Sequence, residues 1–163
     1  MRDGPVVGEV VRRVPPRHCD AQAMLHASRP AEYFEDAFLA WLDAACGGYD
    51  RVRAEGADLV IAETTTRYLG SARLDEQVVA RATPVERGDR SLRVRFDLLR
   101  APGEGDGDAD EQVLVTATTA YVCVGPDGPT PLPPVLAAAL AGVRARGARL
   151  AHEGGDRDTG PDG

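Results

Sequence analysis

An amphipathic helix is predicted over Arg29–Cys46. Its apolar side chains recur at spacings of three and four residues, at Tyr33, Phe34, Ala37, Phe38, Trp41 and Leu42. Pro30 suits the first helical turn, where the missing backbone N–H costs no hydrogen bond, and Gly47-Gly48 ends the segment. A helix with one broad apolar face has to bury that face against another element, so we expect it to lie at the centre of the fold.

Five further segments have strand patterns, one before the helix and four after it. They are Val6–Val14, Asp58–Tyr68, Asp75–Pro84, Ser91–Leu99 and Gln112–Val124. The fourth alternates most clearly, and its inward positions are predicted to be Leu92, Val94, Phe96 and Leu98. In the second, the same alternation predicts one shared face for Leu59, Ile61, Glu63 and Thr65.

Strands that follow one another through short connections favour antiparallel pairing. The predicted fold class is therefore α+β, with a five-stranded antiparallel sheet wrapped around the central helix and a second helix over Pro134–Leu150. The 163 residues suffice for one domain, which we assign to residues 1–150. Ala101–Glu111 is expected to be an acidic hairpin tip, and Ala151–Gly163 a disordered tail, because neither has enough apolar surface to pack.

Composition argues against several classes of function. The formal net charge of −7 disfavours nucleic acid as a partner, because a duplex binder needs a positive surface. The three cysteines lack C-x-x-C spacing, and no metal site is visible. Without a long apolar run or a signal peptide, the chain is expected to be cytoplasmic. All 19 basic residues are arginine, a bias typical of a GC-rich genome.

Chemistry is most strongly indicated just before the helix. Asp20 lies in a polar turn there, and a helix start offers unpaired backbone N–H groups and the positive end of a dipole. Those groups can stabilise a developing oxyanion, while a carboxylate can attack a carbonyl carbon or activate water. The pattern therefore fits the cleavage of an ester-like bond, although an aspartate in a turn can also serve only to bond nearby backbone N–H groups.

Four short motifs occur in the same order as in a known family: Asp20-Ala21 with Tyr33-Phe34-Glu35 and Ala37, then Arg67–Glu76, Arg90-Ser91-Leu92, and Ala120–Val124. On these motifs the chain resembles the hot-dog-fold thioesterases of the 4-hydroxybenzoyl-CoA thioesterase and YbgC-like acyl-CoA thioesterase family, over about Val6–Leu140. Three positions depart from the family pattern. Ala23 stands where the family has glycine, Pro30 where it has an aromatic residue, and Ala27 where it often has His or Tyr, with His26 one position earlier.

The resemblance implies a hot-dog fold and an acyl-thioester hydrolase that needs no cofactor. Asp20 would be the nucleophile or general base, and the backbone N–H of Ala27 the oxyanion donor. His26 would act as a base or orient the acyl group. Glu35 corresponds to a helix-borne carboxylate that is catalytic in one branch of the fold, and would otherwise be a buried acid paired with Arg67. The family also implies a homodimer or homotetramer in which two sheets join edge to edge and the active sites lie at the interface.

Candidate substrate-binding residues are Arg90, Arg87, Tyr33 and Thr65. The arginines could bind the phosphates of coenzyme A or of a carrier protein's phosphopantetheine arm, since guanidinium groups bind phosphate well. The substrate would be an acyl-CoA or an acyl carrier protein thioester, and a GC-rich genome makes a polyketide pathway conceivable. Two alternatives stay open: a hot-dog hydratase or dehydratase, and an acyl-binding protein without catalytic activity.

Overall fold

The computed structural model describes residues 6–102 and 111–147. The predicted tail and most of the predicted acidic tip lie outside these ranges, so the division of the chain at residue 150 stays a prediction. The elements, in chain order, are β1 (Gly8–Arg13), a short 3-10 helix η1 (Pro16–His18), α1 (Pro30–Cys46), α2 (Tyr49–Ala54), β2 (Asp58–Tyr68), β3 (Gln77–Arg87), β4 (Ser91–Arg100), β5 (Gln112–Gly125), β6 (Gly128–Pro129) and α3 (Pro134–Ala139).

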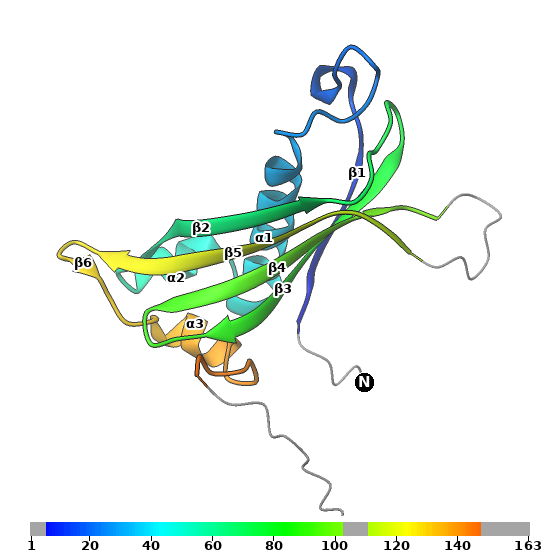
Figure 1. Cartoon of the computed structure of the whole chain (residues 1–163). Coiled ribbons are helices and arrows are strands. Elements are labelled where there is room, and N and C mark those ends of the chain that lie inside the picture. Colours follow the sequence, from blue (N-terminus) through cyan, green and yellow to red (C-terminus); the bar gives the residue numbers. More distant parts are fainter. Residues whose placement is uncertain (1–5, 103–110, 148–163) are drawn as a thin grey trace, which may run out of the picture.

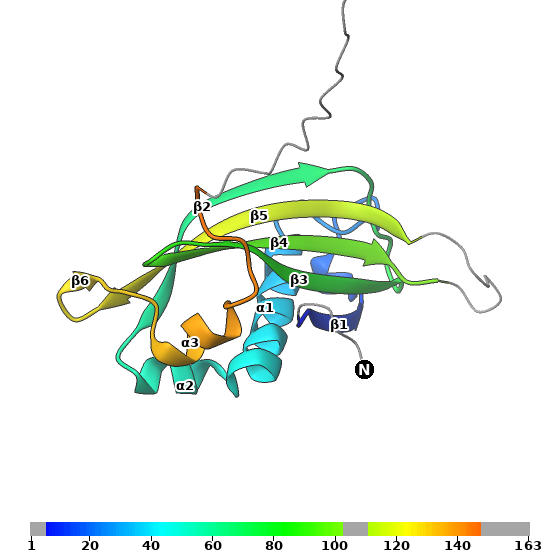
Figure 2. The same cartoon turned by 90° about the horizontal axis from the view of Figure 1, so that it is seen from below.

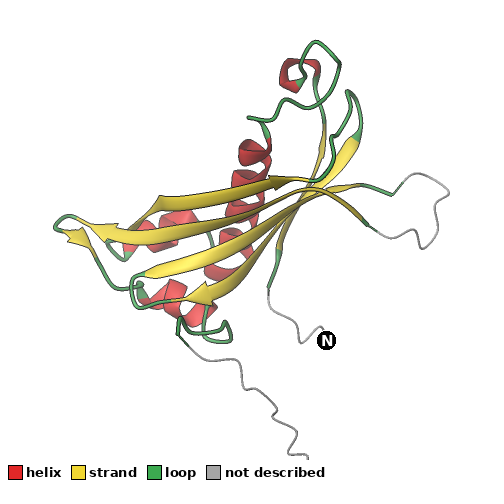
Figure 3. Ribbon diagram, viewed as in Figure 1, coloured by secondary structure: helices red, strands yellow, loops and turns green. Residues whose placement is uncertain are grey.

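One antiparallel sheet contains all the strands, in the order β1-β3-β4-β5-β2, with the two-residue β6 paired to β5. The long strands cross one side of α1 together (Figure 1), and the sheet arches over that helix when seen from below (Figure 2). The short helices α2 and α3 lie near the C-terminal end of α1 (Figure 3). This arrangement confirms the predicted fold class: a curved antiparallel sheet around one long central helix.

The core lies between α1 and the concave face of the sheet. The apolar helix side chains predicted from the sequence are all buried, and so are Leu92, Val94, Phe96 and Leu98 on β4. Phe34 of α1 stacks on Phe96, with ring centroids 5.2 Å apart. The periodicity of α1 and of β4 therefore identified the face that each buries, because burial of apolar area drives the packing.

Strand β1 approaches α1 unusually closely, and Gly8 is the residue that permits this approach. A Cβ at Gly8 would lie 2.5 Å from the backbone nitrogen of Trp41 and would overlap the carbonyl oxygen of Ala37. Both neighbours are backbone atoms of a buried helix, so neither can move aside cheaply. Gly8 therefore fixes how α1 sits against the edge of the sheet.

Three details differ from the sequence predictions. The prediction of a C-terminal helix is wrong beyond Ala139, because residues 140–147 are not helical. This segment instead bonds to the end of β3: the Arg87 N–H donates to the Arg144 carbonyl, and the Arg146 N–H donates to the Arg87 carbonyl. Strand β3 begins at Gln77, because Asp75 has a left-handed φ of 65° in the preceding turn. It also continues past Pro84 to Arg87, where a register shift after Pro84 lets the strand continue beyond the proline.

No helix among the described residues is both long enough and apolar enough to cross a membrane.

We expect Gly8→Ala to lower the free energy of unfolding by about 1–3 kcal/mol, the usual cost of overpacking a core. Urea unfolding followed by circular dichroism would measure this loss. Gly142→Ala is the matched control, because a Cβ there meets nothing within 4 Å. Equal midpoints for the two variants would show that β1 moves away from α1 at no cost.

Candidate functional site

A cavity of about 400 Å³ lies between α1 and the inner face of the sheet, beside the edge strand β2. Most of its wall is apolar and includes the aromatic side chains Phe34, Phe38, Phe96 and Tyr121. Polar groups reach it from three places: the loop before α1 (Ala27 and Ser28), the helix (Glu35), and the strands (Thr64, Thr66 and Thr119). A concave, largely apolar pocket with a few converging polar groups is typical of a small-molecule site.

The cavity-facing residues of β2 differ from those predicted by simple alternation. A register shift between Ile61 and Glu63 inserts an extra residue, so Thr64, Thr66 and Tyr68 face the cavity. Thr65 therefore does not line the cavity, and the predicted shared face with Glu63 and Thr65 is wrong. Instead, the hydroxyl of Thr64 lies 3.0 Å from that of its cross-strand partner Thr119, which is buried.

The loop before α1 presents a backbone donor to the cavity. Ala27 lines the cavity, and its N–H donates to none of the described residues. Its carbonyl oxygen accepts a hydrogen bond from the Tyr68 hydroxyl at 2.8 Å, which fastens this loop to the end of β2. The adjoining start of α1 has no side-chain cap, so its first N–H groups also add positive potential at this point.

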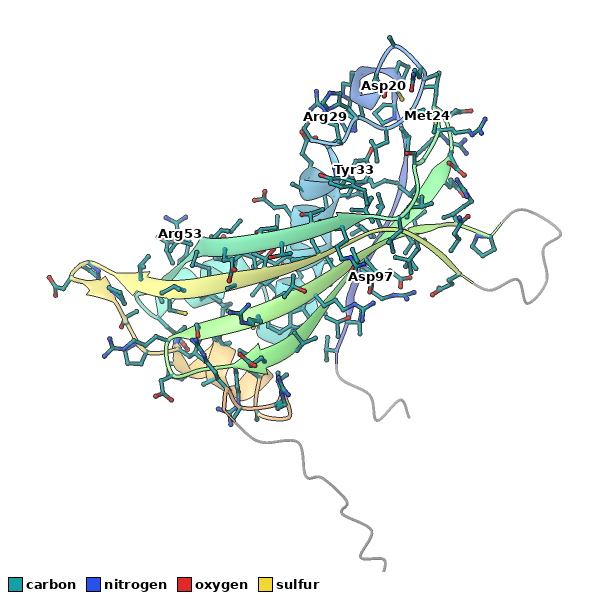
Figure 4. All side chains as sticks on the ribbon, in the orientation of Figure 1. Asp20, Met24, Arg29, Tyr33, Arg53 and Asp97 are labelled. Carbon is teal, nitrogen blue, oxygen red and sulfur yellow. The ribbon has the colours of Figure 1, made fainter. Side chains whose placement is uncertain are left out.

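Asp20 lies on an exposed loop outside this cavity, close to Met24 (Figure 4). Its Oδ1 accepts the backbone N–H groups of Gln22 at 2.8 Å and Met24 at 3.1 Å, and its own N–H donates to the Met24 carbonyl. Ala23, inside this turn, has a left-handed φ of 57°. That conformation suits glycine best, which explains why the resembling family carries glycine at this position.

Glu35 lines the cavity from α1, opposite Tyr121 of β5. It forms no ion pair with any described arginine, so the alternative of a buried acid paired with Arg67 does not hold. The Tyr121 ring stacks on Phe38, with centroids 4.4 Å apart, and its side chain is almost entirely buried. Burial, and to a lesser extent the charge of Glu35, raises the pKa of the Tyr121 phenol. Its hydroxyl, which has no partner among the described residues, therefore stays protonated and can donate into the cavity.

The other predicted site residues lie away from the cavity. The ring of His26 is exposed, and its Nδ1 accepts the Ser28 N–H at 3.2 Å. Tyr33 points to the opposite side of α1, where its hydroxyl lies 2.8 Å from Nδ1 of His18. Arg87 and Arg90 stand at the turn between β3 and β4, at the end of the sheet near α3 (Figure 1). The structure therefore brings only Ala27 and Glu35 of the predicted set together in one cavity.

The sequence predictions did not include Tyr68, Thr119 or Tyr121 as cavity residues, and among the neighbouring threonines of β2 they favoured Thr65 over Thr64. Tyr68 lies in the motif Arg67–Glu76 but was assigned no role there, and the threonines were indistinguishable from ordinary strand residues. In residues 6–102 and 111–147, no group of three or more His, Cys, Asp or Glu side chains could hold a metal ion.

The sequence profile of the thioesterase superfamily matches residues 22–105, just over half of the chain. The chain belongs to the thioesterase superfamily. It is accordingly a thioester hydrolase, as the resemblance implied. The match begins after Asp20 and includes α1, β2, β3 and β4, which contribute most of the cavity wall.

Solved structures share the superfamily fold. A hypothetical protein from Thermus thermophilus has 25% identity and a TM-score of 0.71, covering 84% of this chain and 99% of its own. A 1,4-dihydroxy-2-naphthoyl-CoA thioesterase from Synechocystis has 15% identity and a TM-score of 0.69, over 83% and 96%. The dynemicin thioesterase has 17% identity and a TM-score of 0.70, over 85% and 97%. Among curated proteins, none matches this sequence significantly.

Replacing Tyr121 by Phe should leave stability near neutral pH unchanged or slightly higher, because the hydroxyl has no hydrogen-bond partner to lose in the described part of the chain. In alkali the advantage of the variant over wild type should grow. The folded-state pKa lies above the ordinary value of 10.0, so above that pH the unfolded state releases this proton while the native state retains it. Wild-type stability should therefore fall as pH rises through and beyond this value. Urea unfolding at pH 8 and pH 11 should show a smaller fall for Tyr121→Phe, and equal falls would contradict the raised pKa.

Proposed function

We propose that this thioesterase hydrolyses acyl-CoA thioesters whose acyl group occupies the cavity between α1 and β2. The observation that carries the proposal is the N–H of Ala27, which donates to none of the described residues and lies at the cavity wall next to the start of a long helix. A thioester carbonyl placed there would point its oxygen at this donor. The negative charge that develops on that oxygen would be stabilised by the N–H and by the positive end of the helix dipole.

We further propose that Asp20 supplies the carboxylate. Two backbone N–H groups hold its Oδ1, which leaves Oδ2 fixed in orientation and free to react. As a nucleophile, Oδ2 would bond to the carbonyl carbon and expel the thiolate, and water would then cleave the resulting anhydride. As a general base, it would accept a proton from water while that water attacks the same carbon. Both routes release a carboxylic acid and a thiol.

Glu35 is the alternative candidate for the reacting carboxylate, and its position in the cavity wall is an argument for that role. Its side chain has no hydrogen-bond partner among the described residues, so nothing holds it in a reactive orientation. Asp20, by contrast, is held in one orientation, and a preorganised group is worth more in a transition state than a mobile one. Because Asp20 lies outside the cavity of its own chain, its role also depends on how a second chain completes the site.

A pair of conservative variants separates the two carboxylates. Asp20→Asn keeps the Oδ1 acceptor and therefore the turn, but it removes the charge, so kcat for thiol release should fall at least about a hundredfold. Glu35→Gln should change kcat by less than about tenfold. Thiol released from acyl-CoA can be followed with a chromogenic disulfide, with circular dichroism confirming that both variants fold. The reverse pattern would assign the reaction to Glu35 and leave Asp20 as a turn residue.

The same assay addresses the alternatives that the sequence left open. A hydratase would add water to the acyl chain without releasing thiol, and a purely acyl-binding protein would bind the thioester without turnover. The hydratase pattern needs Asp20 and His26 on one substrate, but His26 does not line the cavity and its Nδ1 is engaged by Ser28. An acyl carrier protein as donor, a polyketide pathway and a cytoplasmic location stay predictions from the sequence.

We also propose that two chains join through β2. This strand forms one edge of the sheet, and large apolar side chains on it and directly after it are exposed: Ile61 at 63%, Tyr68 at 57% and the following Leu69 at 58%. An edge of this kind presents unpaired backbone groups to another strand. Since the cavity lies directly beside β2, a second chain pairing there would cover it and complete its wall.

Val60→Asp on β2 should convert the dimer to a monomer at micromolar concentration, as measured by sedimentation, because it places a charge in the proposed interface. Val11→Asp on β1, the opposite edge, is the matched control and should remain dimeric. Val60 and Val11 have similar exposure, 44% and 52%. A wild-type monomer at this concentration, or a monomer produced only by Val11→Asp, would contradict pairing through β2.

A further inference from the structure

A second cleft lies on the other side of the first turn of α1. Its volume is about 440 Å³, and Glu32 lines both this cleft and the cavity described above. Four arginines surround it together with His18 and Tyr33, whereas the only carboxylates in its wall are Glu32 and Asp36. The labelled side chains of Arg29 and Tyr33 mark its position at the start of α1 (Figure 4).

Three of the arginines are held in place by neighbouring groups. The Nε of Arg12 donates to Asp36 at 3.1 Å, and an Nη of Arg29 donates to Glu32 at 2.7 Å. Arg13 donates to the carbonyl of Asp75 at 2.7 Å and lies 3.3 Å from its carboxylate. Each guanidinium has five N–H donors in a planar fork, so each keeps donors for a ligand while its position is fixed.

Arg17 differs from the other three because it forms no ion pair with any described residue. Its backbone carbonyl accepts a hydrogen bond from Arg29 at 3.4 Å, which places the two residues side by side. The chain as a whole carries a formal net charge of −7, so the four arginines around this cleft make it locally more positive than the chain as a whole. An unpaired guanidinium beside three anchored ones is suited to a doubly charged oxyanion such as phosphate.

We propose that this cleft binds a phosphate group on the thiol-bearing half of the thioester substrate. The inference rests on the proposed function, because it places the reacting carbonyl at Ala27, two residues before Arg29. The acyl group would then occupy the apolar cavity, and the leaving thiol would extend past the first turn of α1 towards the arginines. In this proposal the phosphate-binding role expected for Arg90 and Arg87 belongs instead to Arg17 and its neighbours, across the first turn of α1 from the cavity.

The test compares three substrates with the same acyl group: acyl-CoA, acyl-phosphopantetheine, which has one terminal phosphate and no nucleotide, and acyl-cysteamine, which has no phosphate. Arg17→Ala should raise KM for acyl-CoA about tenfold with kcat unchanged, since a binding contact common to ground and transition state is lost. KM for acyl-cysteamine should not change. Added salt should narrow the difference between variant and wild type.

Arg53→Ala is the control, because it removes the same charge from an exposed, ion-paired arginine of α2 far from Arg29 (Figure 4). It should leave KM for all three substrates unchanged. Arg17→Lys, which keeps the charge but not the fork, should give an intermediate KM for acyl-CoA. These variants separate loss of a specific contact from a general change in net charge.

The substrate series also identifies which phosphate is bound. Raised KM for both acyl-CoA and acyl-phosphopantetheine assigns the cleft to the phosphate next to the pantetheine arm, whereas raised KM for acyl-CoA alone assigns it to the nucleotide. No rise for acyl-CoA, or an equal rise for acyl-cysteamine, overturns the proposal. If the wild type hydrolyses none of the three substrates, the proposed hydrolytic function is wrong, but the cleft can still be tested. Free coenzyme A is then titrated calorimetrically into wild type and Arg17→Ala. Weaker binding by the variant supports the phosphate site, and equal binding overturns it.

Discussion

The packing of α1 against the concave face of the sheet determines where everything else in this molecule can lie. Gly8 lets β1 touch the helix backbone near Ala37 and Trp41, so the helix cannot roll or slide without overlap. With α1 fixed, successive residues of its first turns face different ways. Phe34 and Glu35 line the apolar cavity, while Tyr33 and Asp36 line the arginine-rich cleft. One buried contact therefore fixes the helix that separates the apolar cavity from the arginine-rich cleft.

In contrast to the buried helix α1, the edge strand β2 is the least buried of the long strands. It nevertheless forms a wall of the cavity. Its bulge after Ile61 changes which side chains face inward, and the Tyr68 hydroxyl at its end holds the loop that carries Ala27. The cavity wall that β2 forms is therefore packed against the sheet on one side and open to solvent on the other, which leaves the site incomplete in a single chain. We therefore expect assembly and catalysis to be coupled in this thioesterase, since in the proposed dimer the chain that covers β2 would also close the cavity.

Much of the fold could be predicted because it depends on periodic burial. The helix over Arg29–Cys46 and the alternation over Ser91–Leu99 follow directly from apolar spacing, and both are confirmed. The site was predicted less well. A single extra residue in β2 exchanges Thr65 for Thr64, and nothing in the sequence Glu63-Thr64-Thr65-Thr66 shows where that residue is inserted. Tyr33 and Arg90 were assigned to substrate binding from their residue type and their place in short motifs, but their positions relative to the cavity depend on long-range packing that a local pattern does not encode.

The departures of this chain from its family pattern have a common physical explanation. At positions 23, 27 and 30, the structure uses the backbone and not the side chain: a left-handed turn at Ala23, an N–H at Ala27, and the first helical residue at Pro30. Many residue types can supply a backbone N–H, and alanine can adopt a left-handed φ at a modest cost. In the proposed site the shape of this loop matters more than its side chains at these positions, and Asp20 and Tyr68 hold that shape by hydrogen bonds. A thioesterase site built in this way can therefore diverge in sequence while its geometry stays the same.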